Sequence, residues 1–235
     1  MVLKLKIAGI WFILKIRKDL IMNRIIMLEG CDRTGKSTFI NYLEDELKSK
    51  GYIPITFHLM GPTKFQGFQF NNDDKSLIQL SKFNDEYDLI FEMIKSDSRI
   101  IIILDRTSFG EFIWTKYWDR TGKYTDYVTS SEFIEKHRKL MDASIYIEYY
   151  MSDIETLEKR IKDSEEDTKI FTINDKSIKE NIEYVYNLYN DLSEIVKKNG
   201  IKYMKIDSSK FKSFLDVKEY INNEINLNHI LFSVR

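Results

Sequence analysis

The residues best suited to chemistry lie between Gly30 and Ser37, which read Gly-Cys-Asp-Arg-Thr-Gly-Lys-Ser and fit the pattern G-x-x-x-x-G-K-S. Its two glycines permit backbone angles that a side chain would hinder, so successive N–H groups can turn inward around phosphate oxygens. Lys36 adds a charge suited to β- and γ-phosphates, and the Ser37 hydroxyl is a ligand for Mg²⁺. This stretch predicts a loop that binds the phosphates of a nucleoside triphosphate.

A second pair of chemical groups, Asp105 and Arg106, follows the apolar run Arg99 to Leu104. A run of this kind is typical of a central parallel strand that is buried on both faces. In doubly wound sheets ligands bind at the carboxyl ends of the strands, which predicts that this pair lies beside the phosphate loop. A carboxylate there can hold Mg²⁺, and an arginine can bind an acceptor phosphate through two hydrogen bonds. The alternative is a structural ion pair at a strand end.

The elements that must position these residues alternate between strands and helices. The loop follows an apolar strand at Ile25 to Leu28 and precedes residues that are apolar at helical spacing up to Gly51. Further strands are predicted at Ile53 to Met60, Arg99 to Leu104, Ala143 to Tyr149 and Ile201 to Ile206. Further helices are predicted at Asp73 to Lys95, around Phe133 to Leu140, Ser152 to Ile161, Asn174 to Lys198 and Phe214 to Ile225. This order predicts a three-layer α/β fold with a five-stranded, mostly parallel sheet flanked by helices.

Composition is that of one globular enzyme domain. The chain has 235 residues, 43% of them hydrophobic, and a formal net charge of −1, so no global field favours nucleic acid or an anionic membrane. The one cysteine, Cys31, cannot form an intramolecular disulfide, which fits a reducing compartment, and we expect a cytoplasmic protein. We divide the chain into an N-terminal extension (1–22), a domain built around the phosphate loop (23–226) and a C-terminal tail (227–235).

The N-terminal extension contains eight uncharged residues, Ile7 to Leu14, far fewer than the roughly 20 that a membrane-spanning helix needs. A signal peptide is one interpretation, although charged residues, Lys15 to Asp19, follow the run where a small-residue cleavage site would be expected. The other is a non-essential extension, with Met22 as the working start.

The loop also carries a family resemblance. The string L-E-G-C-D-R-T-G-K-S-T resembles the phosphate loop of the thymidylate kinase family, roughly [FL]-E-G-x-D-x-x-G-K-S-T, and matches it at Glu29, Asp32 and Gly35 to Thr38. Asp105-Arg106 and the residues up to Phe109 resemble the family's D-R-Y element. The resemblance implies a P-loop nucleotide kinase that uses ATP with Mg²⁺ to phosphorylate a deoxynucleoside monophosphate, above all dTMP, for DNA precursor synthesis. It also implies a possible homodimer.

The resemblance assigns roles residue by residue. Asp32 would contact the acceptor sugar's 3′-hydroxyl and Arg33 would reach the γ-phosphate; the alternative is that both are solvated loop charges. Phe83 would stack on the acceptor base, and the alternative for this helix aromatic is a place in the core. Lys36, Arg33, Asp105 and Arg106 are the expected catalytic residues, with Asp105 and Arg106 also at the acceptor and Ser37 and Asp105 at the metal. Residues expected to hold ATP are Gly30, Cys31, Asp32, Arg33, Thr34, Gly35, Lys36, Ser37, Thr38 and, beside a lid at Lys162 to Lys169, Arg160.

Departures from the family pattern leave the identity of the acceptor substrate undecided. Met60-Gly61-Pro62-Thr63-Lys64 stands where the family has an Arg-Glu-Pro-type element, and Tyr87 follows Phe83 where an arginine commonly reads thymine. A deoxynucleoside kinase, which phosphorylates a hydroxyl, is the alternative, but it needs a carboxylate base that the end of the second strand does not obviously supply. A non-catalytic P-loop switch is a further alternative. Guanine-specific switches carry N-K-x-D, whereas Asn174-Asp175-Lys176 has the wrong order.

For two histidines and an aromatic stretch, structural roles are at least as well supported as functional ones. We interpret His58 as a packed or edge residue and expect His137 to be exposed on its helix. The aromatic residues between Glu111 and Asp126 fit either a wall of the acceptor pocket or the hydrophobic core.

Overall fold

The computed structural model describes residues 24–58, 87–118, 126, 130–172 and 175–223, and the backbone of residues 2–7 and 10–15. Its described part contains a five-stranded sheet in the order β4-β5-β3-β6-β7, in which every neighbouring pair is parallel. The strands are β3 (Ile25–Glu29), β4 (Ile53–His58), β5 (Ile100–Asp105), β6 (Ser144–Tyr150) and β7 (Lys202–Asp207). The prediction of a three-layer α/β fold is therefore confirmed.

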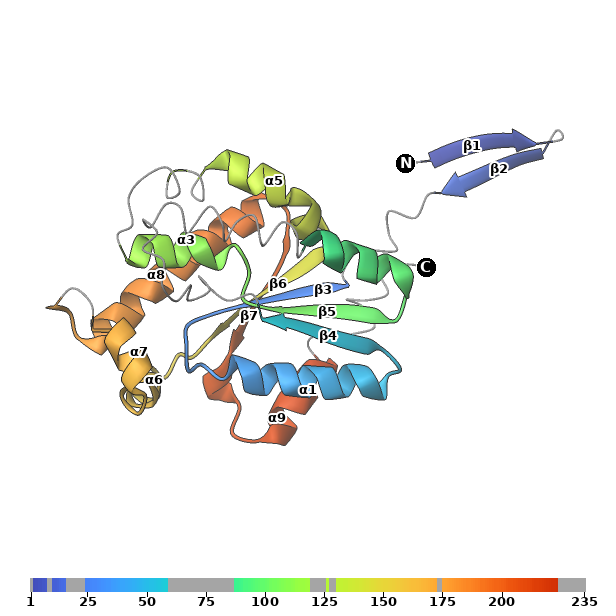
Figure 1. Cartoon of the computed structure of the whole chain (residues 1–235). Coiled ribbons are helices and arrows are strands. Elements are labelled where there is room, and N and C mark those ends of the chain that lie inside the picture. The colour runs from blue at the N-terminus through green and yellow to red at the C-terminus, as the bar shows by residue number, and fades with distance from the viewer. Residues whose placement is uncertain are drawn as a thin grey trace, which may run out of the picture.

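Helices cover both faces of this sheet (Figure 1). One face carries α1 (Lys36–Ser49) and α9 (Phe214–Asn223), and the other carries α3 (Gly110–Tyr117), α5 (Ser131–Asp142), α8 (Ile178–Lys198) and the helical residues 87–96. Two short helices, α6 (Ile154–Lys162) and α7 (Glu165–Ile170), follow β6, and a 3₁₀ turn, η3 (Ser208–Lys210), follows β7. Near the N-terminus, β1 (Val2–Ile7) and β2 (Ile10–Lys15) pair antiparallel.

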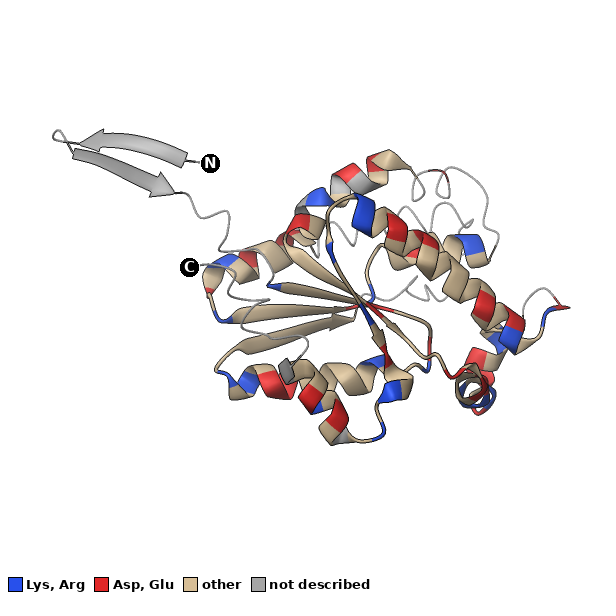
Figure 2. Cartoon of the chain, turned by 180° about the vertical axis from the view of Figure 1, so that it is seen from behind, with Lys and Arg blue, Asp and Glu red and all other residues tan. Residues whose placement is uncertain are grey.

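Alternation along the strands creates the two layers of core. In β3, Ile25 and Met27 belong to the cluster beneath α3, α5 and α8, while Ile26 and Leu28 belong to the cluster beneath α1. All six residues of β5 are buried, as expected of a central parallel strand. Figure 2 shows the consequence: the strands are mostly uncharged, while acidic and basic residues mix along the outer faces of the helices.

Most predicted helices are found where the sequence places them. Asp153 caps α6 by accepting a hydrogen bond from the Thr156 N–H, and Ser177 and Glu180 form a capping box at the start of α8. Only residues 87–96 of the predicted helix Asp73 to Lys95 are described, and they are helical; Phe83 lies outside the described residues. None of the described helices is long and apolar enough to cross a membrane.

The prediction that His137 is exposed is wrong. Its residue is 3% exposed, and its ring packs 4.3 Å from that of Phe133, one turn earlier on α5. The face of α5 that holds both residues is therefore turned toward the core. The open question about the aromatic stretch is also answered for α3, because Phe112, Trp114 and Tyr117 are all core residues.

Candidate functional site

The phosphate loop connects β3 to α1 and is held in shape by its glycines. A Cβ atom on Gly30 would lie 2.0 Å from the carbonyl oxygen of Tyr149 in β6, so only glycine allows β3 and β6 to approach this closely. Gly35 adopts φ 96° immediately before α1, a left-handed angle that also favours glycine. The loop therefore ends at the N-terminus of α1, so its backbone N–H groups lie next to the positive end of the helix dipole.

Lys36, the first residue of α1, is 7% exposed and bends back toward the loop. Its ammonium donates hydrogen bonds to the carbonyl oxygens of Gly30 and Cys31, at 2.9 and 2.7 Å. Burial, and then the charge of Arg106, lower the pKa of this ammonium. A phosphate would give Lys36 a charged partner in place of two neutral carbonyls, so the geometry suits an anionic ligand.

Arg106 lies directly after β5 and faces the loop. Its backbone has φ 68° and its N–H donates to the Leu28 carbonyl at 3.0 Å, so the left-handed turn docks it against β3. The guanidinium pairs with Asp32 and lies 5.6 Å from the ring centre of Trp114. Although burial alone lowers the pKa of Arg106, Asp32 and the other nearby acidic groups raise it above its ordinary value. The side chain is therefore a permanent, pre-oriented cation.

Asp105 and His58 are paired neighbours on β5 and β4, and His58 Nδ1 lies 2.7 Å from Asp105 Oδ2. An ionised carboxylate only accepts hydrogen bonds, so Nδ1 carries the proton of this contact. The other oxygen, Asp105 Oδ1, is buried and has no hydrogen-bond partner within the described part of the chain. A buried oxygen of this kind is suited to ligate a cation. The exposed Ser37 lines the same pocket, and its hydroxyl offers a second oxygen. Two oxygen ligands, completed by water and phosphates, are typical of a magnesium site in a kinase.

Glu29, the last residue of β3, is fully buried. Its Oε1 accepts hydrogen bonds from the N–H and the hydroxyl of Thr107, at 2.6 and 2.7 Å. Burial raises the pKa of Glu29 to about 7, against the opposing effects of the Thr107 hydrogen bonds and of Arg106. The match at Glu29 with the family pattern therefore marks a group that holds the backbone after β5, behind the pocket.

Asp167 of α7 lines the site beside Arg33 of the phosphate loop. Arg33 Nε contacts Asp167 in α7, and Arg160 Nη1 donates to the Arg33 carbonyl at 3.3 Å. Sequence reasoning missed Asp167, because nothing in its spacing separates it from the solvated charges around it. It also assigned His58 an edge role, although the position of this residue at the end of a parallel strand was a usable signal.

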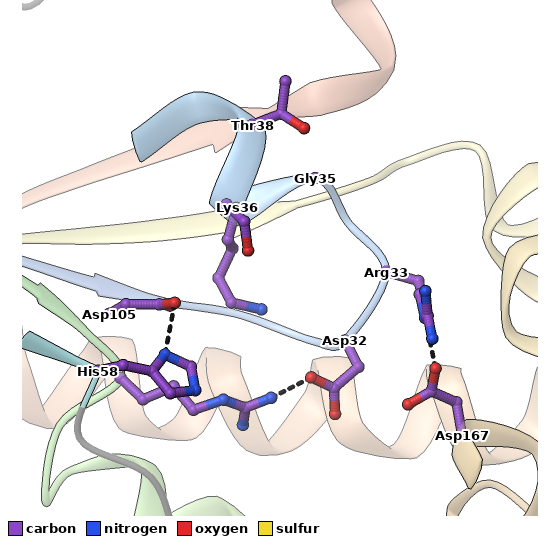
Figure 3. Close-up of a pocket in the computed structure, with 10 residues that line it drawn as sticks. Asp32, Arg33, Gly35, Lys36, Thr38, His58, Asp105 and Asp167 are labelled. Carbon is purple, nitrogen blue, oxygen red and sulfur yellow. Dashed lines mark hydrogen bonds and ion pairs between the residues drawn. The ribbon is translucent and has the colours of Figure 1, made fainter. Parts of the chain in front are cut away.

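These groups surround one pocket of about 400 Å³ (Figure 3). Its lining residues are Asp32, Arg33, Gly35, Lys36, Ser37, Thr38, His58, Asp105, Arg106 and Asp167. Eight of the predicted site residues are therefore brought together. The side chains of Cys31 and Thr34 are buried under the loop, so a ligand could reach only their backbone. Gly30 and Arg160 lie behind the lining residues and contact them.

Comparison with known proteins identifies the fold. The sequence matches no protein-family model and no curated protein significantly. Among solved structures, the chain resembles YorR protein from Bacillus subtilis in complex with phosphorylated GDP (19% identity, 87% of this chain and 97% of that one, TM-score 0.51). It also resembles thymidylate kinase from Ehrlichia chaffeensis (16% identity, 86% and 96%, TM-score 0.52). The five-stranded parallel sheet and these likenesses show that the chain has a thymidylate-kinase-like P-loop kinase fold.

Proposed function

We propose that the protein is an ATP-dependent nucleotide kinase that transfers the γ-phosphoryl group to a deoxynucleoside monophosphate, with dTMP as the leading acceptor. The observation that carries the proposal is that the phosphate loop, with Lys36, lines the same pocket as Asp105 and Arg106. The phosphate loop supplies groups that would bind a nucleoside triphosphate. Within the same pocket, Arg106 supplies a cation that would bind the phosphate of the acceptor. The likeness to a thymidylate kinase structure supports this reading.

On the donor side, the backbone N–H groups of the loop and the positive end of α1 would bind the β- and γ-phosphates. Lys36 would exchange the two carbonyls for phosphate oxygens. Arg33 would reach the γ-phosphoryl group, where charge redistributes during transfer. Magnesium, held by Ser37 and Asp105 when bound, would neutralise charge on the phosphates.

On the acceptor side, Arg106 would bind the acceptor phosphate through its planar fork, since Asp32 and Trp114 already hold it in place. Asp32 would accept a hydrogen bond from the sugar 3′-hydroxyl with an oxygen not engaged by Arg106. The acceptor phosphate is anionic at neutral pH, so it needs positioning more than it needs a general base.

A coupled assay that follows ADP formation tests the proposal. The panel contains ATP·Mg²⁺ with dTMP, the other deoxynucleoside monophosphates, GMP and the corresponding nucleosides; guanine compounds are included because the Bacillus protein holds a guanine nucleotide. We expect turnover with at least one monophosphate, dTMP first. Turnover with nucleosides and with none of the monophosphates would contradict the proposal.

The contact between His58 and Asp105 favours a second candidate, a deoxynucleoside kinase. Sequence analysis found no obvious base at the end of the second strand, but a histidine lies there, oriented by a carboxylate. With its proton on Nδ1, a neutral imidazole presents Nε2 as an acceptor for a hydroxyl proton. The same panel separates the candidates. If a nucleoside is the acceptor, His58→Asn should abolish its phosphorylation, because asparagine can replace Nδ1 toward Asp105 but supplies no base.

A further inference from the structure

We infer that Asp167 is a positioning residue that fixes the guanidinium of Arg33, so that its terminal nitrogens remain available for the transferring phosphoryl group. The inference rests on the proposed function, because it assigns Arg33 to the donor phosphate. Both side chains line the pocket, one from the phosphate loop and one from α7 (Figure 3). Arg33 is half exposed, whereas the Asp167 side chain is 13% exposed.

The contact uses only one edge of the guanidinium. Asp167 Oδ2 accepts from Nε, and within the described part of the chain the two terminal nitrogens have no hydrogen-bond partner. The terminal nitrogens carry four of the five N–H donors of an arginine. The carboxylate therefore restrains the rotation of the side chain and leaves its fork free to span two phosphate oxygens.

Asp167 can act as a restraint because α7 is itself anchored. The Tyr117 hydroxyl of α3 donates to the carbonyl of Ile170 at 2.9 Å, and Asn181 of α8 donates to that of Phe171, also at 2.9 Å. Phe171 is fully buried in the core. The carboxylate is thus carried by a helix that is tied to both α3 and α8.

The backbone of Arg33 is held from the same direction. Its φ of 62° is a left-handed angle that is costly for a residue with a side chain. Arg160, from α6, donates to its carbonyl oxygen at 3.3 Å. The segment containing α6 and α7 therefore contacts Arg33 at both its backbone and its side chain.

The opposite role, in which Asp167 keeps Arg33 away from ATP, predicts different kinetics for a variant without the carboxylate. If the carboxylate competed with ATP for Arg33, removing it would free the arginine, so kcat or ATP affinity would rise. If it positions Arg33, removing it would let the side chain move, so kcat would fall with little change in the KM for ATP. The size of the fall follows from geometry, because a displacement of about 1 Å can cost up to roughly a hundredfold in rate.

The test is a double-mutant cycle on the full chain with Arg33→Ala, Asp167→Ala and both together. We expect Asp167→Ala to lower kcat by roughly 10- to 100-fold and to have no further effect once Arg33 is alanine. Asp167→Asn should retain more activity than the alanine variant, since its amide oxygen can still accept from Nε. Glu166→Ala, which alters an exposed residue of the same helix, is the matched control and should leave kcat unchanged. An unchanged or raised kcat in Asp167→Ala, or an equal loss in both Arg33 backgrounds, would overturn the inference.

A second measurement separates failure of this inference from failure of the proposed function. The ¹⁵N resonance of Arg33 Nε–H, assigned by its loss in Arg33→Ala, reports the contact without turnover. We expect slow solvent exchange of this proton in the wild type and in Glu166→Ala, and fast exchange in Asp167→Ala. A wild type that phosphorylates no acceptor would contradict the proposed function, whereas an exchange rate that is equally fast in all three proteins would contradict the positioning of Arg33.

Discussion

Replacing Arg106 with alanine tests the acceptor side of the site. The substitution removes a partly buried cation that contacts Asp32 and lies near the ring of Trp114, while the phosphate loop and Lys36 stay intact. If Arg106 binds the acceptor phosphate, the variant loses a hydrogen bond between two charged groups. The donor contacts, which are made by the loop, should be largely unaffected.

The expected rise in the KM for the acceptor follows from the strength of the lost hydrogen bond. Hydrogen bonds to charged groups contribute about 1.5–3 kcal/mol, and each 1.4 kcal/mol corresponds to a factor of ten, so the KM for the acceptor should rise roughly 10- to 150-fold. The pre-existing contacts favour the upper part of this range, because Arg106 is already oriented before the acceptor binds. Arg106→Lys should recover only part of the loss, since an ammonium lacks the planar fork.

Steady-state kinetics with each substrate varied in turn measures the effect. Arg99→Ala is the matched control, because Arg99 is an exposed arginine that pairs with Asp97 at the opposite end of the same strand. Thermal unfolding of each variant accompanies the kinetics, so that loss of folded protein is recognised. A rise in the KM for ATP with an unchanged KM for the acceptor would refute the reasoning and assign Arg106 to the donor.

Three further predictions concern the loop and the buried acid behind it. Lys36→Ala should bind ATP more weakly, as measured by calorimetry, and lose most of its turnover, because it removes the charge aimed at the phosphates; near-normal kinetics would mean that the loop does not hold the donor. Glu29 has a folded-state pKa of about 7 against an ordinary value of 4.5, so it stays protonated longer when folded, and its contribution to stability falls as pH rises between these values. Relative to Glu29→Gln, the wild type should therefore lose about 3 kcal/mol of unfolding free energy between about pH 4.5 and pH 7, measured by denaturant titration; parallel pH profiles would argue against a raised pKa. Gly30→Ala should destabilise the protein by several kcal/mol, because its Cβ would meet the Tyr149 carbonyl. Gly51→Ala, whose added Cβ has no described residue within 4 Å, should cost about 1 kcal/mol in thermal or chemical unfolding, and equal costs would contradict the predicted clash.

Much of the fold could be predicted because the sequence signals for its strands, helices and phosphate loop are local. The apolar run before Asp105, the glycine pattern of the loop and the capping residue Asp153 each indicate the structure of their own segment. The capping box at Ser177, which starts α8, was a local signal of the same kind that the predicted start at Asn174 did not use. The order of strands and helices then restricts the sheet to a few parallel arrangements. The loop and the Asp105-Arg106 pair were predicted to meet for the same reason, since both follow strands whose carboxyl ends share one edge.

The remaining features depend on contacts between segments that are distant in sequence. Asp167 lies 134 residues from Arg33, and no periodicity connects them. His137 is an exception, because it stands four residues after Phe133 and three before Leu140, both buried, so helical spacing already places it on the buried face of α5. Tyr87, which follows Phe83 where the family has a base-reading arginine, donates to the Ser108 hydroxyl and so holds the turn after β5. Such side-chain roles follow from tertiary packing, which sequence spacing does not encode.

The most direct test of the account follows the phosphoryl group itself. ATP labelled in its γ-phosphate is incubated with Mg²⁺, the protein and dTMP, and the labelled product is separated and identified. We predict label in dTDP with the wild-type protein and a large reduction with Lys36→Ala. Label that appears only in inorganic phosphate, for dTMP and for every other monophosphate of the panel, would contradict the claim that this pocket transfers phosphoryl groups between nucleotides.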